Sequence, residues 1–545
     1  MDRVGYVALC YALSVAAILS CAVYAVVYGA WFQRRRQKIT DTEGFVTARA
    51  TQGMGRIGWS FFCGAVGAWA LVTPANFASF AGIVGVCAYA AATGIPILMI
   101  ALFGDRIMAG MPHVFSLSDF VGWRFGPIAK TIVALIALFN MCIVLLAEYT
   151  TIGSIFSDFV GTIPWPVIVV VGLATMAYTS YGGLLVSIAT DQVQGVASAA
   201  LMVAAAVYIG VVHRQPIPKP LPEALGATAT GWESIFTLGA SLTASYLFSE
   251  AMWQRVWASV DKPTLYGGAA IGVVLTTSLI FLTGFGGWLA IAKGLVTPDT
   301  NPNLYFFQLF GTGYVSSAMG VVLVLLAALM NEGAIDSLQN GIASSLGGHF
   351  FKHAPLWCNR VGVIALNVPL MVLAITRGYN VLSLFLVTNL LCCCAAVPIA
   401  LGLLRRPNAF FTESGCVFGI ASGVLALTAL GIGTKWDPSN VGASFAAGAD
   451  WAWFSNAYHW SAFLTAILAS TAGDLMWCTA AAGLRRAGVR GPGISGLLMA
   501  VPGMGYVTAT PGWSREAQPK GWDDLPAAGA PLVGAAPSKD VELAP

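Results

Sequence analysis

The stretch AALMNEGAIDSLQNGIASS, from Ala327 to Ser345, places two acidic residues inside an otherwise apolar segment. Glu332 and Asp336 are four residues apart, so on a helix they lie on the same face. A carboxylate at membrane depth costs at least about 2.5 kcal/mol, and it is kept where a cavity, a bound cation or a proton compensates that cost. The pattern therefore predicts a membrane-embedded site of ion or proton coupling. The alternative is that the helix ends near Met330 and the acids begin a cytoplasmic extension.

Composition places the whole chain in the membrane. Of its 545 residues, 57% are hydrophobic and only 9% are charged, which is outside the range of soluble globular proteins. Because one span takes about 20 apolar residues, the apolar segments fill most of the length and leave no room for a large soluble catalytic domain. The sequence also contains no HExxH or GxSxG motif, so it argues against an enzyme.

Hydrophobic segments separated by loops predict an all-α protein with about thirteen membrane spans. The spans are expected at 4–32, 58–82, 83–104, 128–158, 165–182, 188–213, 232–258, 266–293, 303–348, 359–376, 380–404, 415–433 and 456–484. Basic residues concentrate in alternate loops, most densely between Arg34 and Arg56. By the positive-inside rule, this distribution puts the N-terminus outside and the C-terminus in the cytoplasm. The 11 cysteines show no metal-ligand spacing, and no cofactor is expected.

Glycines and a proline interrupt the second predicted span, at Gly64, Gly67 and Pro74. A broken helix survives in lipid only where its freed backbone groups face protein, water or a ligand. Such breaks mark the substrate site of many transporters. Close helix packing through small residues explains the same glycines, and the residues alone leave both readings open.

The segment YTSYGGLLVSIATDQVQG, which starts at Tyr178, resembles the most characteristic segment of the sodium:solute symporter family. LLAEYTTIGSIF around Glu148 and EAMWQRVWAS around Arg255 look like further family segments, so the resemblance spans roughly residues 55–485. Within the family, WSFFCGAVGAWALVTPANFASFAGIVGV followed by MPHVFSLSDFVGWRFG looks most like the urea active transporter branch, which is made of urea/proton symporters.

This resemblance implies a LeuT-like fold of two inverted five-helix repeats, with the second and seventh spans broken at the substrate site. Four regions follow. Residues 1–57 would form an extra span and a basic cytoplasmic loop, 58–404 the transporter core, and 405–486 additional spans. Residues 487–545 would form a cytoplasmic tail, whose composition is that of a disordered segment.

The resemblance also implies positions for the coupling ion. In the family its ligands come from the backbone of the second span, and from an alanine and two hydroxyl residues of the ninth. The matching positions are Trp69, Val72, Ala328, Asn331 and Glu332. Asn331 and Glu332 stand where the hydroxyls belong, which predicts coupling to protons with Glu332 as carrier and Asp336 as relay, because burial favours a protonated carboxyl. Sodium held by a modified ligand set is the alternative.

Asn76, Tyr246 and Glu250 match the family's substrate region, and Ser249 is a further candidate because its hydroxyl could hydrogen-bond a small polar solute. Asn76 is equally explained as a helix breaker beside Pro74, and Glu250 by pairing with Arg255. Asp191 is the candidate gate of the inner exit, with a helix cap as the competing reading. Glu148 is expected to hydrogen-bond a neighbouring helix first and to serve transport second.

Together these patterns predict a secondary active symporter in the plasma membrane that imports a small polar solute by alternating access. Its partners would be the solute, a coupling cation (H⁺ or Na⁺) and membrane lipid, with no nucleic acid. Urea is the expected solute. A polyamine or another organic solute is the alternative within this class, because Glu250, Glu332 and Asp336 would then act as counter-charges to a cationic solute. A transporter-like membrane sensor is the alternative from another class.

Overall fold

The computed structural model describes residues 2–35, 42–111, 114, 116–311, 313–350, 355–404 and 410–487. Within these ranges the chain forms helices and no β-strand. Ten of the helices there are long and apolar enough to cross a membrane. All but the first residue of the predicted cytoplasmic tail lies outside the described residues.

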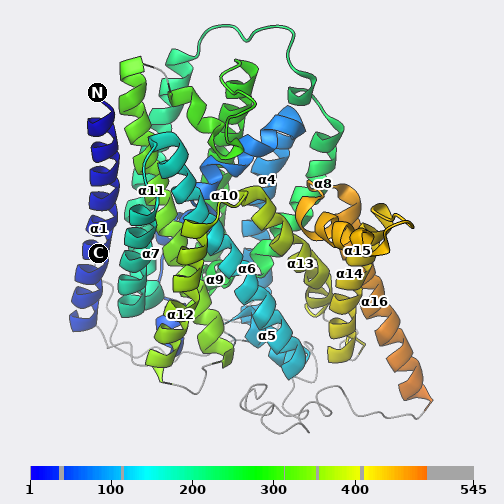
Figure 1. The fold of residues 1–545 in the computed structure, drawn as a ribbon. Coiled ribbons are helices and arrows are strands. Elements are labelled where there is room, and N and C mark those ends of the chain that lie inside the picture. The colour runs from blue at the N-terminus through cyan, green and yellow to red at the C-terminus, as the bar shows by residue number, and fades with distance from the viewer. Residues whose placement is uncertain are drawn as a thin grey trace.

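The helices run mostly parallel to one another and form a bundle (Figure 1). The long ones are α1 (Arg3–Arg35), α4 (Thr73–Gly110), α6 (Pro127–Ser154), α7 (Trp165–Val212), α10 (Lys262–Ala292), α11 (Gly313–Ser345), α12 (Leu356–Thr376), α13 (Val381–Leu401), α14 (Glu413–Thr434) and α16 (Trp460–Arg486). The shorter ones are α2 (Thr42–Thr47), α3 (Met54–Ala65), α5 (Leu117–Arg124), α8 (Ala229–Leu247), α9 (Glu250–Ala258) and α15 (Val441–Asp450). Tight or wide turns of helix occur at η1 (Ala68–Leu71), η2 (Ile155–Val160), η3 (Glu223–Leu225), η4 (Pro302–Leu304), η5 (Phe306–Phe310), η6 (Leu346–Phe350) and η7 (Trp451–Ser455).

Two of the long helices change direction at a glycine. Gly82 in α4 has a φ angle of 63°, and Gly183 in α7 has a φ angle of 58°. Residues with a Cβ rarely adopt such angles, so glycine is the residue that allows the chain to turn there. Both turns fall where the sequence predicts one span to end and the next to begin. The total of thirteen crossings and their orientation remain predictions.

The ninth predicted span, 303–348, is too long at its start. Residues 302–310 form the short turns η4 and η5, and α11 begins only at Gly313. Apolar residues such as Phe306 and Phe310 made this stretch look like part of the helix, although they are buried in turns that pack against α10 and α11. Pro302 and Gly311 bracket these turns, and both residue types interrupt helices.

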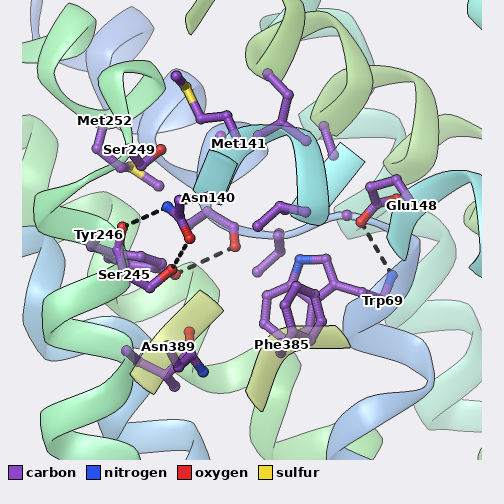
Figure 2. A pocket seen from close by; sticks show the side chains of 18 of the residues that line it. Trp69, Asn140, Met141, Glu148, Ser245, Tyr246, Ser249, Met252, Phe385 and Asn389 are labelled. Atoms are coloured by element: carbon purple, nitrogen blue, oxygen red, sulfur yellow. Dashed lines mark hydrogen bonds between the residues drawn. The ribbon is translucent and has the colours of Figure 1, made fainter. Parts of the chain in front are cut away.

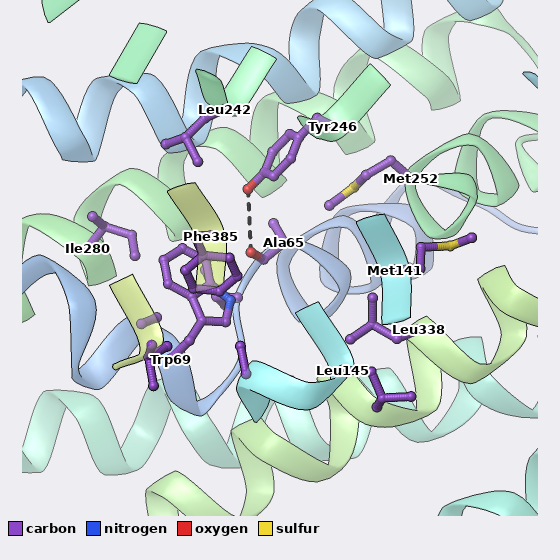
Figure 3. Packing of buried hydrophobic residues seen from close by; sticks show 14 of the residues in the cluster. Ala65, Trp69, Met141, Leu145, Leu242, Tyr246, Met252, Ile280, Leu338 and Phe385 are labelled. Atoms are coloured by element: carbon purple, nitrogen blue, oxygen red, sulfur yellow. Dashed lines mark hydrogen bonds between the residues drawn. The ribbon is translucent and has the colours of Figure 1, made fainter. Parts of the chain in front are cut away.

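The second and seventh predicted spans are both broken, as expected. The second consists of α3, two extended residues at Val66 and Gly67, the turn η1, and the start of α4. The seventh consists of α8 and α9, separated at Phe248 and Ser249. The two breaks are tied together because the Tyr246 hydroxyl donates to the Ala65 carbonyl at 3.3 Å (Figure 3).

At the two edges of the bundle lie helices that flank this broken pair. The N-terminal helix α1 packs against α7 and α11, and α14 packs against α16 on the opposite side (Figure 1). Residues 441–450, expected as part of a loop, form the short helix α15, which packs on α14. The extra N-terminal span is therefore part of the helix bundle and directly contacts α11.

A buried ion pair joins α5 to α6 and offers a test of this packing. Lys130 Nζ lies 3.0 Å from Asp119 Oδ1, and the two side chains are 2% and 1% exposed. An ion pair of the same types, Lys262 with Asp105, has a similar distance of 2.8 Å but is 41% and 18% exposed.

We predict that Lys130→Met destabilises the protein by about 3–5 kcal/mol, because it removes one partner of a buried ion pair. The control Lys262→Met should cost less than about 1 kcal/mol, since water screens the exposed pair. Thermal unfolding of the purified proteins in detergent measures both. Equal losses of stability would contradict the buried packing of α5 on α6.

Candidate transport site

A cavity of about 60 Å³ lies where the two broken spans meet. Its walls come from α3, η1, α4, α6, α8, α9, α11 and α13, and from the links between the broken helices. This volume holds only a few water molecules, whereas sites for small molecules usually measure about 300–1,000 Å³. At this volume the cavity must widen to admit a solute.

Glu148 of α6 is the charged side chain on the cavity wall among the described residues (Figure 2). Its carboxylate accepts hydrogen bonds from the backbone N–H groups of Ala68 and Trp69, at 3.1 and 3.4 Å. It also accepts one from Asn331 Nδ2 at 2.7 Å. The side chain is fully buried. Glu148 thus satisfies the backbone donors that the break in the second span leaves without helical partners.

This contact depends on the missing side chain of Gly67. A Cβ atom added there would lie 2.1 Å from Glu148 Oε1 and 2.6 Å from the Ala334 Cβ. Both distances are far shorter than a van der Waals contact. Glycine at this position is what allows a carboxylate from α6 to reach the backbone of the broken helix.

Amide and hydroxyl groups line the side of the cavity away from Glu148 (Figure 2). Asn140 Nδ2 donates to the Ser245 carbonyl at 3.1 Å, and Thr388 Oγ1 donates to Asn140 Oδ1 at 2.7 Å. Asn389 Nδ2 donates to the Tyr458 hydroxyl, whereas its Oδ1 is buried without a hydrogen bond. Asn389 therefore offers an unused acceptor on a side chain that lines the cavity.

Aromatic and apolar side chains complete the walls. The rings of Trp69 and Phe385 pack edge to face with centroids 5.5 Å apart, and Tyr89 lies beside Trp69. Met141, Leu242 and other buried residues continue this surface (Figure 3). A carboxylate together with aromatic faces is the combination that binds organic cations, through charge and cation–π attraction.

Some of the predicted site residues lie at this cavity. Tyr246, Ser249 and Trp69 line it. Asn331 does not line it but is bonded to Glu148, which does. Val72 and Ala328 are buried behind the wall.

Two predicted substrate residues lie elsewhere. Asn76 is on α4, one turn beyond the break, and is absent from the cavity wall. Glu250 begins α9, and its Oε1 accepts the N–H of Leu117 at 2.9 Å at the start of α5. Its expected alternative partner, Arg255, instead pairs with Asp191.

Asp191 and Arg255 belong to a second, buried polar cluster. Arg255 Nη2 lies 3.3 Å from Asp191 Oδ2 and 2.6 Å from Ser337 Oγ, and Ser60 Oγ donates to the same Asp191 oxygen at 2.6 Å. These contacts join α3, α7, α9 and α11, which is an arrangement suited to a gate. The competing helix-cap reading of Asp191 is wrong, because the residue lies inside α7, eight positions beyond the turn at Gly183.

Glu332 and Asp336 also lie away from the cavity. Both are fully buried on α11. Asp336 accepts hydrogen bonds from Thr190 and Asn340, at 3.1 and 2.8 Å. Glu332 faces Gln194 of α7 and Cys21 of α1. The two acids therefore occupy the interface of α11 with α7 and α1.

Sequence reasoning did not single out Asn140, Ser245, Phe385 or Asn389. Phe385 and Asn389 stand in an apolar helix without a break or a motif, Asn140 lies ahead of the LLAEYTTIGSIF segment on α6, and Ser245 lies just before the break between α8 and α9. A polar amide in the middle of an apolar span, as at Asn140 and Asn389, is the one signal that pointed to them.

Known proteins with a similar sequence or a similar fold are transporters. No family model matches the chain. Over 370 residues it is 27% identical to the spermidine transporter DUR31 of Candida albicans (strain SC5314 / ATCC MYA-2876). This matched region covers 67% of this chain and 70% of that protein.

Among solved structures, the chain resembles a Na⁺-coupled sialic acid symporter with a TM-score of 0.62, at 14% identity, over 86% of this chain and 98% of the other. It also resembles MhsT in complex with L-phenylalanine, with a TM-score of 0.50, at 15% identity, over 78% and 99% of the two chains. A third neighbour is the nucleobase-cation-symport-1 transporter Mhp1 with bromovinylhydantoin bound, with a TM-score of 0.50, at 12% identity, over 82% and 96%.

The chain is thus an integral membrane protein with the LeuT-like fold of cation-coupled symporters. Its relative and its structural neighbours are transporters and not enzymes. The comparisons do not support the urea branch, and the narrower assignment to the sodium:solute symporter family remains a resemblance.

We predict that Gly67→Ala separates Glu148 from the backbone of Ala68 and Trp69 and lowers the melting temperature of the purified protein. Each buried donor left unpaired costs about 1–3 kcal/mol. Gly55→Ala is the matched control, because an added Cβ at that helical position meets nothing within 4 Å. If the two variants melt alike, the Glu148 contact contributes nothing to the fold.

Proposed function

We propose that this protein imports a polyamine-class organic cation such as spermidine across the plasma membrane, driven by a proton gradient. The observation that carries the proposal is Glu148, a fully buried carboxylate on the cavity wall beside the rings of Trp69 and Phe385. The 27% identity to a spermidine transporter supports the same solute class.

Charge balance favours a cationic solute over urea. A neutral solute offers the buried Glu148 carboxyl only hydrogen bonds, whereas an ammonium group also supplies the opposite charge that favours the ionised carboxylate in a site of low dielectric constant. Within the described wall no lysine or arginine competes for this role. Urea was the first expectation from sequence, and the cavity gives it no comparable advantage.

A polyamine carries several amino groups along a flexible chain, so it needs acceptors at more than one place. Glu148 lies on one side of the cavity and Asn389 on the other, with Trp69 and Phe385 between them (Figure 2). The unused Oδ1 of Asn389 can accept from a second ammonium group. The methylene segments between the amines would then pack on the aromatic rings.

Uptake of labelled spermidine into vesicles containing the purified protein tests the proposal. A proton gradient imposed alone should drive accumulation, and an excess of unlabelled urea should not compete. Accumulation driven only by sodium would mean that sodium, and not the proton, is the coupling ion. The unpaired Oδ1 of Asn331 would then be a candidate sodium ligand. Absence of spermidine uptake under either gradient would overturn the solute assignment.

We predict that Glu148→Gln weakens spermidine binding at least about 30-fold, because losing one partner of a buried charge pair costs about 2 kcal/mol or more. The control Glu223→Gln removes an exposed carboxylate and should leave binding unchanged. Equilibrium binding of labelled spermidine to the purified variants measures the difference. Glu148→Asp, which keeps the charge, should bind better than Glu148→Gln, and the reverse order would contradict the role of the charge.

A further inference from the structure

A second set of buried polar groups without partners lies outside the cavity, where α11 meets α7 and α1. Glu332 of α11 and Gln194 of α7 are 0% and 1% exposed. Neither oxygen of the Glu332 carboxylate has a hydrogen bond of normal geometry, and neither does the oxygen or the nitrogen of the Gln194 amide. Polar atoms buried in a membrane interior without a hydrogen bond of normal geometry indicate that a proton or another ligand binds between these two side chains.

The groups that face Glu332 carry no positive charge among the described residues. They are Cys21 of α1, Tyr178 and Gln194 of α7, and Asp336 on its own helix. The Tyr178 hydroxyl is also buried without a hydrogen bond.

Polar groups on the other helices around α11 bind residues other than Glu332. Arg255 of α9 is bound to Asp191 and Ser337, and Cys63 of α3 donates to the Asp191 carbonyl. Glu148 of α6 is held by Asn331, on another face of α11. Among the described residues, no positively charged side chain faces Glu332. Its charge must therefore be neutralised by a species that comes from outside the protein.

The ligand that fits this set best is a proton. A protonated carboxyl group has one donor and one acceptor, and the Gln194 amide offers the matching acceptor and donor. A sodium or other hard cation prefers about six oxygens. The carboxylate, the amide and Tyr178 supply at most four. Of the other two neighbours, Asp336 already accepts hydrogen bonds from Thr190 and Asn340 on its two carboxylate oxygens, and Cys21 is a soft thiol that suits other metals.

We propose that Glu332, Gln194 and Cys21 form a proton-binding site that is separate from the substrate cavity and is closed against lipid by the N-terminal helix α1. The role of this site in coupling rests on the proposed function. Its existence does not, because protonation of Glu332 can be observed without any solute.

The separation of the sites has a mechanistic consequence. Asn331 and Glu332 are neighbours on α11, yet the first binds Glu148 at the cavity and the second faces α1 and α7. A shift or rotation of this one helical turn alters both contacts together. Proton and solute are thus coupled through α11 and do not compete for one carboxylate, and by linkage each favours binding of the other.

Infrared spectroscopy of the purified full-length protein tests the proton site directly. The wild type should show a protonated-carboxyl band near neutral pH that disappears on titration to alkaline pH. Glu332→Gln should lack that band. Asp474→Asn, which changes another buried carboxyl with an unpaired oxygen on α16, should keep it. An unchanged band in Glu332→Gln would overturn the proposal.

Variants of Cys21 test the contribution of α1. Cys21→Ala should keep the band, because it leaves the Glu332–Gln194 pair intact. Cys21→Lys places a cation beside Glu332, so it should hold the carboxyl ionised and remove the band. If the band survives in Cys21→Lys, α1 does not form part of the site.

Transport distinguishes this proposal from the proposed function. Glu332→Gln should lose proton-driven accumulation of spermidine while still exchanging internal for external spermidine. Retained proton-driven accumulation would overturn the coupling role of Glu332. A wild type that shows the band but never takes up spermidine would refute the solute assignment and leave the proton site standing.

Discussion

The structure depends on one constraint, which is that a helix broken inside a membrane must find partners for its freed backbone groups. At Val66 and Gly67 the second span loses its helical hydrogen bonds, and water is not freely available there. The carboxylate of Glu148 meets this need by accepting from Ala68 and Trp69. Because these donors stabilise negative charge, the same contact places a carboxylate on the cavity wall, where a cationic solute can use it.

From this constraint the roles of the surrounding helices follow. The seventh span breaks beside the second, and the Tyr246 hydroxyl bridges the two. α11 runs behind both breaks and presents different residues to different neighbours: Asn331 to Glu148, Glu332 to α7 and α1, and Ser337 to Arg255. A single helix therefore contacts the cavity, the proposed proton site and the buried cluster around Asp191. Such a helix can transmit a change at one of these places to the others.

Much of this architecture could be predicted from sequence, because its causes are local. Apolar runs gave the spans, Gly67 and Pro74 indicated the first break, and Gly183 marks the turn between two spans in α7. Glu332 and Asp336, one helical turn apart, were expected inside an apolar span, and the structure has both fully buried.

Residue partners depend on how helices rotate against one another, and one sequence does not reveal this. Glu332 was expected at the ion position of the family, yet it faces α1, a helix outside the repeat that the resemblance describes. Glu250 was expected either to face the solute or to pair with Arg255, and it instead accepts from the backbone at the start of α5. Conversely, Asn389 reaches the cavity from a span that carries no other sign of function, and Asn140 reaches it from α6, where only Glu148 was singled out.

The most direct test of the central claim is an experimental structure of the protein with spermidine bound. The account predicts density for the solute across the cavity, with one amino group within hydrogen-bond distance of Glu148 and the chain against Trp69 and Phe385. Spermidine bound elsewhere, with Glu148 still held only by Ala68, Trp69 and Asn331, would contradict it.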